Sequence, residues 1–258
     1  MTQLPFFKYQ ATGNDFILLD NTSGEINHSV HLAKTLCDRK FGIGSDGLII
    51  IQKHPEYDFE MVFYNPDGSM SLCGNGSRCA VNFAQKLKLI DTKCTFLAHD
   101  GPHEAEILED EIVKLKMGDV HSVSNLTDGT FIDTGSPHLI VFSENVDSLD
   151  VYENGKAIRY NATFKDKGVN INFVEDLEDG IFVRTYERGV ENETLSCGTG
   201  VTASALASGI NGKSSPINIK TKGGNLKVAF DKVSDADFEN IFLIGPAKEV
   251  FSGTIVVD

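Results

Sequence analysis

The sequence predicts an α+β fold made of two homologous α/β-roll domains, each a mixed or antiparallel sheet wrapped around one central helix. Three observations lead to this prediction. Short motifs recur in the same order at offsets of 122 to 126 residues, and strand and helix patterns follow the same order in each half. In addition, residues 201–210 have a helical pattern without any charged side chain, which is typical of a helix enclosed by other structure.

The repeat is visible as pairs of matching motifs. Thr12-Gly13-Asn14 matches Thr134-Gly135-Ser136, and Cys73-Gly74-Asn75-Gly76 matches Cys197-Gly198-Thr199-Gly200. The segments 42–44 and 59–64 match 168–170 and 181–186 in the same order. Such ordered self-similarity indicates a duplicated unit. We therefore expect one domain over residues 1–120 and a second over residues 121–258, with the last strand able to return to the N-terminal half.

The first elements of each half are a strand and an amphipathic helix. Apolar side chains spaced at the helical period predict a helix over residues 30–40, with Ser29 as its N-cap and Gly42 as its stop. Its counterpart is a helix near residues 151–160 that Asp150 caps. The remaining expected elements are strands at 16–19, 48–52, 59–64, 139–142, 169–174 and 181–186, second helices at 77–89 and 201–210, and hairpin-like strands that finish each half.

Composition excludes several classes of protein. Hydrophobic residues make up 41% of the chain and charged residues 23%, which is typical of a globular protein rather than a disordered, collagen-like or coiled-coil one. The net charge of −14, without a basic cluster, argues against a nucleic-acid partner. The longest aliphatic run, residues 48–51, is too short to span a membrane. An odd number of widely spaced cysteines and a start without a signal-peptide pattern favour reduced thiols in the cytoplasm.

Cys73 and Cys197 hold the same place in each half, at a glycine-rich turn from strand to helix. Glycines there leave backbone N–H groups exposed at a helix N-terminus, which binds anions and favours a thiolate. If the two domains are related by a pseudo-twofold, both helix starts face one cleft and the thiols flank a bound carbon. A base on each face of one carbon is what inversion of a stereocentre requires, and fixed N–H donors would make an electron-sink cofactor unnecessary.

Six stretches carry a resemblance to a known family. They are Gly13-Asn14-Asp15-Phe16, Asn65-Pro66-Asp67-Gly68, Cys73-Gly74-Asn75-Gly76-Ser77-Arg78-Cys79, Gly135-Ser136-Pro137-His138, Tyr186-Glu187-Arg188-Gly189 and the run from Glu193 to Gly200. Together they resemble diaminopimelate epimerases over nearly the whole chain. The resemblance implies interconversion of LL- and meso-diaminopimelate, a step toward lysine and cell-wall precursor, by a cytoplasmic homodimer without pyridoxal phosphate or a metal.

The resemblance also implies roles for individual residues. Cys73 falls on the proton donor and Cys197 on the proton acceptor, while His138 and Glu187 fall on residues that adjust the thiol pKa values. The implied substrate contacts are Asn14, Asn65, Gly74, Asn75, Asn170, Glu187, Arg188, Gly198 and Thr199, with Gly47 and Ser136 at positions where the family commonly has glutamine and asparagine. An arginine can grip a distal carboxylate of diaminopimelate bidentately.

Other interpretations of these cysteines stay open. A proline or hydroxyproline racemase would also use paired Cys-Gly loops, but its smaller substrate has no need for Arg188 and Asn65. A dithiol redox protein would bring two cysteines together, although it normally uses a Cys-x-x-Cys pair, which is absent here. An amino-acid-binding protein would not require both thiols. We interpret Cys37, Cys79 and Cys94 as buried small apolar residues, and the histidine pairs as solvated rather than metal-binding.

Overall fold

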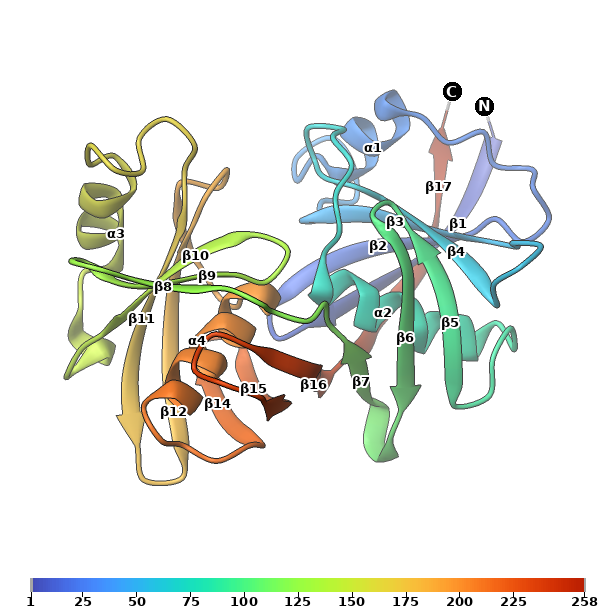
Figure 1. Cartoon of the computed structure of the whole chain (residues 1–258). Coiled ribbons are helices and arrows are strands. Elements are labelled where there is room, and N and C mark those ends of the chain that lie inside the picture. The colour runs from blue at the N-terminus through green and yellow to red at the C-terminus, as the bar shows by residue number, and fades with distance from the viewer. Residues whose placement is uncertain (1, 258) are drawn as a thin grey trace. The chain divides into compact units, whose positions relative to one another are not determined.

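The computed structural model describes residues 2–257, apart from the side chain of Asp110, and the chain divides into two compact units. Unit 2 comprises Lys116–Ile244, and unit 1 comprises the residues up to Leu115 together with those from Gly245 onward. The end of the chain belongs to unit 1 because β17 (Lys248–Val257) pairs antiparallel with β1 (Thr2–Ala11). Both strands lie beside each other in Figure 1, next to the two labelled ends of the chain.

The strands of unit 1 follow a mixed order of pairings. β1 pairs antiparallel with β2, β2 parallel with β3, β3 antiparallel with β4, and β4 parallel with β5. β6 then pairs antiparallel with both β5 and β7. The bounds are β2 (Asn14–Asp20), β3 (Gly47–Gln52), β4 (Phe59–Tyr64), β5 (Lys93–Ala98), β6 (Gly101–Ile107) and β7 (Ile112–Lys116), with a short 3-10 helix η1 (Glu109–Glu111).

Unit 2 repeats this order. β10 pairs antiparallel with β9 and parallel with β11, β11 antiparallel with β12, β12 parallel with β14, and β15 antiparallel with β14 and β16. The bounds are β8 (Val123–Leu126), β9 (Gly129–Asp133), β10 (Pro137–Phe142), η2 (Val146–Ser148), β11 (Asn170–Leu177), β12 (Gly180–Glu187), β13 (Asn192–Thr194), β14 (Ile217–Thr221), β15 (Gly224–Lys232) and β16 (Phe238–Pro246). The shared topology confirms the predicted fold class of two homologous α+β units.

Two pairs of helices complete the units. α1 (Val30–Cys37) and α3 (Val151–Arg159) follow the second strand of each repeat, and α2 (Gly74–Lys86) and α4 (Gly198–Ile210) lie at the centre. Ser29 and Asp150 accept hydrogen bonds from N–H groups of α1 and α3, which confirms both predicted N-caps. α1 ends three residues before the predicted Lys40, because Asp38 is extended and its carboxylate accepts the N–H groups of Lys40 and Phe41.

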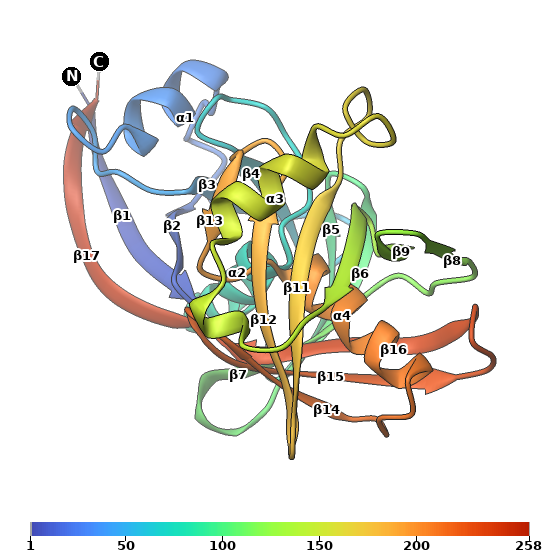
Figure 2. The same cartoon turned by 90° about the vertical axis from the view of Figure 1, so that its left-hand side faces the viewer.

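The parallel pairs β2–β3 and β10–β11 are covered on both faces. In unit 1, α2 contacts β1 to β4 and β6, while Ala33 and Leu36 of α1 pack on the opposite face with Ile17 and Leu48. In unit 2, Figure 1 shows α3 and α4 on opposite sides of β11 and β12, and Figure 2 shows the same units from a second direction. Strands buried on both faces are rich in consecutive apolar residues, which explains the aliphatic run 48–51.

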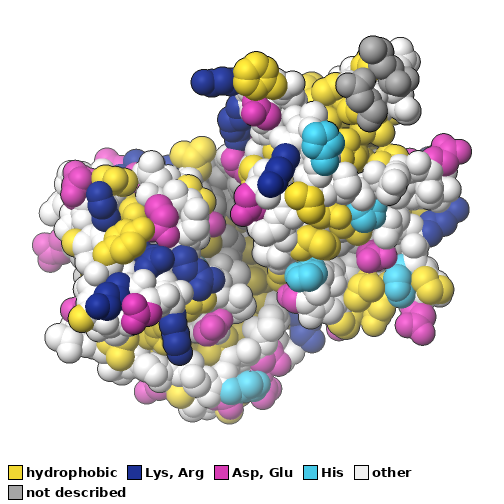
Figure 3. Space-filling model, turned by 90° about the horizontal axis from the view of Figure 1, so that it is seen from above, with side chains coloured by type: hydrophobic (Ala, Val, Ile, Leu, Met, Phe, Trp, Pro, Cys, Tyr) yellow, Lys and Arg dark blue, Asp and Glu magenta, His cyan; other side chains and the backbone are white. Residues whose placement is uncertain are grey.

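The face of the chain drawn in Figure 3 carries side chains of both charges. Figure 3 shows lysine and arginine side chains interspersed with aspartate and glutamate over the face in view. Across residues 2–257, no helix is both long enough and apolar enough to cross a membrane.

Candidate active site

Cys73 and Cys197 occupy the same position in their units. Each is the N-cap of the central helix, with an extended backbone, and its carbonyl accepts the first intrahelical hydrogen bond, at 2.7 Å for Cys73 and 2.9 Å for Cys197. α2 and α4 therefore begin three residues earlier than predicted, directly after each cysteine. The first N–H groups of a helix have no acceptor within it, so both thiols lie at the positive end of a helix dipole.

In unit 1, Cys73 lies beside two of the predicted substrate-binding asparagines. Its Sγ is 3.7 Å from Oδ1 of Asn14, and the N–H of Gly76 donates to Sγ at 3.5 Å. Nδ2 of Asn75 donates to the same Oδ1 at 3.3 Å. Asp46, which the sequence analysis did not single out, accepts Nδ2 of Asn14 at 2.7 Å. The structure thus brings Asn14, Cys73 and Asn75 together around one amide oxygen.

Asn65 and Gly47 occupy different settings in unit 1. Asn65 follows β4, and its Nδ2 donates to Ser69 and, at 3.1 Å, to Oγ of Ser71, two residues before Cys73. Gly47 begins β3, where a Cβ atom would lie 2.3 Å from Cε2 of Phe63. A side chain at position 47 would collide with that buried ring, so Gly47 offers only its backbone in this chain.

In unit 2, Cys197 begins a chain of hydrogen bonds that ends in the sheet. Its Sγ is 3.5 Å from Oγ1 of Thr199, which lies 2.9 Å from Nε2 of His138. Nδ1 of His138 is 2.8 Å from Oδ1 of Asn172, whose Nδ2 donates to Thr185. Because Oδ1 of Asn172 only accepts, the proton of His138 lies on Nδ1 and its Nε2 accepts the Thr199 hydroxyl. Thr199 thus links Sγ of Cys197 to the imidazole of His138.

The environment of His138 keeps its imidazole neutral. The side chain is completely buried, and this loss of solvation lowers its pKa to about 4. The hydrogen bond with Asn172 raises the pKa and the charge of Arg188 lowers it, but burial is the largest influence. A neutral His138 fits the tautomer deduced from the hydrogen bonds.

The burial of His138 makes stability depend on pH. In the unfolded chain a histidine has a pKa near 6.5, so between about pH 6.5 and pH 4 the unfolded state binds a proton that the folded state does not. Stability contributed by His138 is therefore present above pH 6.5 and is lost as the pH falls toward 4, by on the order of 3 kcal/mol. Urea unfolding between pH 7.5 and pH 4.5 should show a smaller loss in His138→Gln than in the wild type. An equal loss in both proteins would contradict this role.

The other predicted residues of unit 2 meet where β10, β11 and β12 begin or end. Nδ2 of Asn170 donates to Oγ of Ser136 at 2.9 Å, and its Oδ1 accepts the N–H of Arg188 at 2.8 Å. The Arg188 side chain is exposed, with one nitrogen 3.3 Å from the carbonyl oxygen of Lys167. Glu187 accepts the Thr194 hydroxyl at 2.8 Å. Asn170 thus connects Ser136 to the Glu187-Arg188 pair.

The three remaining cysteines are buried, as expected. Burial raises the pKa of the Cys37, Cys79 and Cys94 thiols, which disfavours reactive thiolates at these positions.

Three residues of the site were not predicted from the sequence: Asp46, Arg78 and Asn172. For two of these residues the sequence offered a hint, because they lie next to predicted site residues: Asp46 precedes Gly47, and Arg78 lies within the Cys73 motif.

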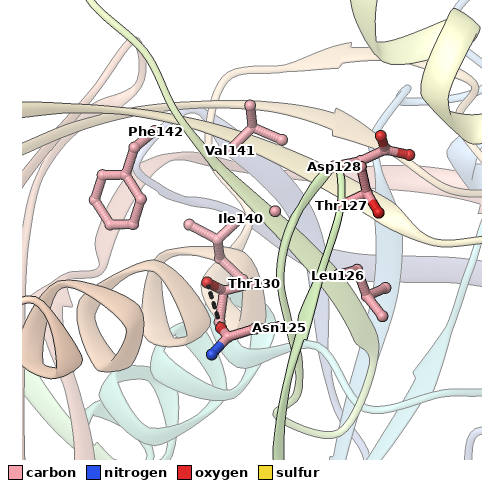
Figure 4. Close-up of a pocket in the computed structure, with 9 residues that line it drawn as sticks. Asn125, Leu126, Thr127, Asp128, Thr130, Ile140, Val141 and Phe142 are labelled. Carbon is pink, nitrogen blue, oxygen red and sulfur yellow. Dashed lines mark hydrogen bonds between the residues drawn. The ribbon is translucent and has the colours of Figure 1, made fainter.

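A shallow pocket of about 330 Å³ lies outside this arrangement. Figure 4 shows it between the β8–β9 hairpin and β10, where Thr130 donates to Asn125. Its lining, residues 125–130 and 140–142, contains neither cysteine nor any other predicted site residue. In the described part of the chain, residues 2–257, no group of three or more histidine, cysteine or acidic side chains is arranged to hold a metal ion.

Solved structures with the same fold come from several families. A PhzF-family phenazine biosynthesis protein of Bacillus anthracis superposes with a TM-score of 0.75 at 16% identity, and each chain is covered completely. A hydroxyproline epimerase of Agrobacterium vitis, with trans-4-hydroxy-L-proline bound, has a TM-score of 0.70 at 13% identity and covers 98% of this chain and 92% of its own. At these identities the likeness shows the fold alone.

Sequence comparison identifies the family. The diaminopimelate epimerase family model matches residues 6–123 and 130–250. A diaminopimelate epimerase of Flavobacterium psychrophilum is 48% identical over 98% of this chain and all of its own. One of Chlorobaculum tepidum is 42% identical over 96% of this chain and 99% of its own, and one of Aquifex aeolicus 38% identical over 98% of each. With the cysteine at the start of each central helix, these matches show that the chain belongs to the diaminopimelate epimerase family of isomerases.

Proposed function

We propose that this protein interconverts LL- and meso-diaminopimelate by using Cys73 and Cys197 as a pair of acid and base. The observation that carries the proposal is the equivalent placement of the two cysteines, each as N-cap of the buried central helix of its unit. A duplicated fold that keeps a thiol at the same helix start in both copies, in a chain of the diaminopimelate epimerase family, supports a symmetrical role for the two side chains.

The proposed reaction moves one proton off and another onto the same carbon. The Cys197 thiolate takes the α-proton, and the electron pair of the broken C–H bond moves into the adjoining carboxylate. Cys73 then delivers its S–H proton to the opposite face of the carbon. The enzyme is left with Cys73 as thiolate and Cys197 as thiol, which is the form that the reverse reaction requires. Removal and return by two different groups inverts the configuration.

Charge develops on the substrate carboxylate during this step. The N–H groups of Gly74 and Asn75 at the start of α2, and of Gly198 and Thr199 at the start of α4, are fixed donors at helix N-termini. Fixed donors aimed at a developing oxyanion lower the barrier by about 3 to 4 kcal/mol for each effective donor. We propose that these four residues bind the reacting carboxylate.

The second amino-acid group of diaminopimelate needs its own partners. The exposed guanidinium of Arg188 can bind the distal carboxylate bidentately, and Glu187 can bind an ammonium group. Asn65, Asn170 and Ser136 supply neutral donors and acceptors. We assign His138, neutral and linked to Cys197 through Thr199, to the control of that thiol together with Glu187.

We further propose that the enzyme acts in the cytoplasm as a homodimer, as its family membership suggests. Five cysteines, an odd number and widely spaced along the chain, suit a reducing compartment. Apolar side chains of Val250, Phe251 and Val256 on β17 are about half exposed, which supports association of two copies. Light scattering should give a mass twice that of the 28.2 kDa chain, and a monomer at micromolar concentration would contradict the dimer.

A panel of substrates tests the proposed function. The fully reduced protein is incubated in deuterated buffer with LL-diaminopimelate, L-proline or trans-4-hydroxy-L-proline, and optical rotation and α-deuterium are followed. We expect inversion and deuterium uptake with diaminopimelate alone. Exchange of proline or hydroxyproline would instead support a racemase of those substrates. Reduction of a disulfide substrate without any α-exchange would support a dithiol redox protein.

A further inference from the structure

Four side chains of unit 1 form one directional row of hydrogen bonds. Nη2 of Arg78 donates to Oδ1 of Asn75 at 2.9 Å, and Nδ2 of Asn75 donates to Oδ1 of Asn14 at 3.3 Å. Nδ2 of Asn14 donates in turn to Oδ2 of Asp46 at 2.7 Å. The row therefore starts at a guanidinium and ends at a carboxylate, with two amides between them.

The charged ends determine how both amides face. A guanidinium only donates hydrogen bonds, so the atom of Asn75 beside Arg78 must be its oxygen. A carboxylate only accepts, so the atom of Asn14 beside Asp46 must be its nitrogen. Turning either amide over would place two donors or two acceptors against each other. The oxygen of Asn14 consequently points toward Asn75 and toward Sγ of Cys73.

This orientation bears on the protonation of Cys73. Oδ1 of Asn14 can accept a hydrogen bond from an S–H group and has nothing to donate to a thiolate. We propose that Asp46 and Arg78 are positioning residues that fix the amides of Asn14 and Asn75, and thereby favour the protonated form of Cys73. The inference rests on the proposed role of Cys73 as acid, although its test requires no turnover.

Of the other charged groups around Cys73, some favour its thiolate and others oppose it. On α2, the cation of Arg78 favours a thiolate at Cys73, and a charge on Cys79 would oppose it. Arg78 is completely buried, and its Nε has no hydrogen-bond partner among residues 2–257. Beyond Asn14, Arg39 binds the carboxylates of both Asp46 and Asp15, and Lys8 binds Asp15. Burial raises the pKa of Asp15, but the bonds from Arg39 and Lys8 outweigh it and keep the net pKa lowered.

These contacts provide a matched control. Asp15 and Asp46 are neighbouring carboxylates that share Arg39, but only Asp46 accepts the side chain of Asn14. Asp15→Asn removes the same charge as Asp46→Asn and leaves the row of hydrogen bonds intact. Asp46→Ala removes both the charge and the acceptor, whereas Asp46→Asn keeps an amide oxygen that can still accept.

The experiment measures the alkylation of each cysteine by iodoacetamide against pH, peptide by peptide, by mass spectrometry. We expect the pH of half-maximal rate at Cys73 to fall by about one unit in Asp46→Ala, by less in Asp46→Asn, and hardly at all in Asp15→Asn. The profile of Cys197 in unit 2 should stay unchanged in all three variants, which also reports that each variant is folded. An unshifted Cys73 in Asp46→Ala, or equal shifts in Asp15→Asn and Asp46→Asn, would overturn the inference. Absence of α-exchange in the wild type would refute the proposed function, but it would not change the alkylation result for Cys73.

Discussion

Replacing either Cys73 or Cys197 by alanine should stop inversion of diaminopimelate, with a loss of about 10²- to 10⁴-fold or more in turnover. Each variant keeps one thiol, and that thiol can still remove the α-proton of the isomer whose proton faces it. Cys73→Ala and Cys197→Ala should therefore each exchange the α-proton of one isomer with solvent without inverting it, and the two variants should select opposite isomers. Proton NMR in deuterated buffer distinguishes exchange from inversion.

Cys94→Ala provides the control for these variants. Cys94 lies in β5, is 6% exposed and takes no part in the proposed chemistry, so its replacement should leave turnover near the wild-type value. Inversion that persists at the wild-type rate in either Cys73→Ala or Cys197→Ala would show that the missing thiol is not one of the two bases.

Replacing Arg184 by methionine should destabilise unit 2 by about 3 to 5 kcal/mol, because the change breaks a buried ion pair. The Arg184 side chain is 6% exposed, and its Nε and Nη2 bind the two carboxylate oxygens of Glu193 at 2.7 and 2.8 Å. Its Nη1 also donates to the carbonyl oxygens of Val146, Asp147 and Leu149. Methionine has a similar length but donates no hydrogen bond, so the three carbonyls and Oε1 of Glu193 lose this donor, while Oε2 of Glu193 keeps Lys222 at 3.1 Å. Urea unfolding measures the loss.

Replacing Arg184 should also disturb the segment that carries Cys197. Glu193 lies in β13, four residues before Cys197, so the pair holds the segment that leads into α4. Lys93→Ala is the matched surface control, since Lys93 is 75% exposed and 3.4 Å from Glu106, and exposed pairs contribute about 0 to 1 kcal/mol. Equal losses of stability in Arg184→Met and Lys93→Ala would contradict the structural role of Arg184.

Patterns along the chain were sufficient to predict much of the fold. The period of apolar residues and the caps at Ser29 and Asp150 located α1 and α3, and motifs at a constant offset revealed the duplication. The starts of α2 and α4 were predicted too late, because a cysteine is an unusual N-cap and the glycines after it are poor helix formers. A return of the last strand to the N-terminal half was expected as an option, but its partner β1 could not be named, because local periodicity carries no information about such a distant pairing.

The candidate site was predictable where the signal lies in a motif. The two Cys-Gly loops predicted equivalent positions for Cys73 and Cys197, and the structure places both at helix starts. Asp46 could not be recognised, because an aspartate before a strand is common on protein surfaces and only the fold brings it to Asn14. Likewise, the neutral state of His138 follows from its complete burial and from Asn172, neither of which is visible in the sequence.

The most direct test of the two-thiol account is the deuterium content of the product at low conversion. Wild-type protein in deuterated buffer is given LL-diaminopimelate, and the meso product of the earliest turnovers is analysed by mass spectrometry. With separate groups removing and returning the proton, essentially every product molecule should carry one solvent deuterium at the inverted carbon, because the donating thiol exchanges with solvent before substrate binds. Product that retains the original hydrogen would show that a single base returns the proton it removed, and would contradict the account.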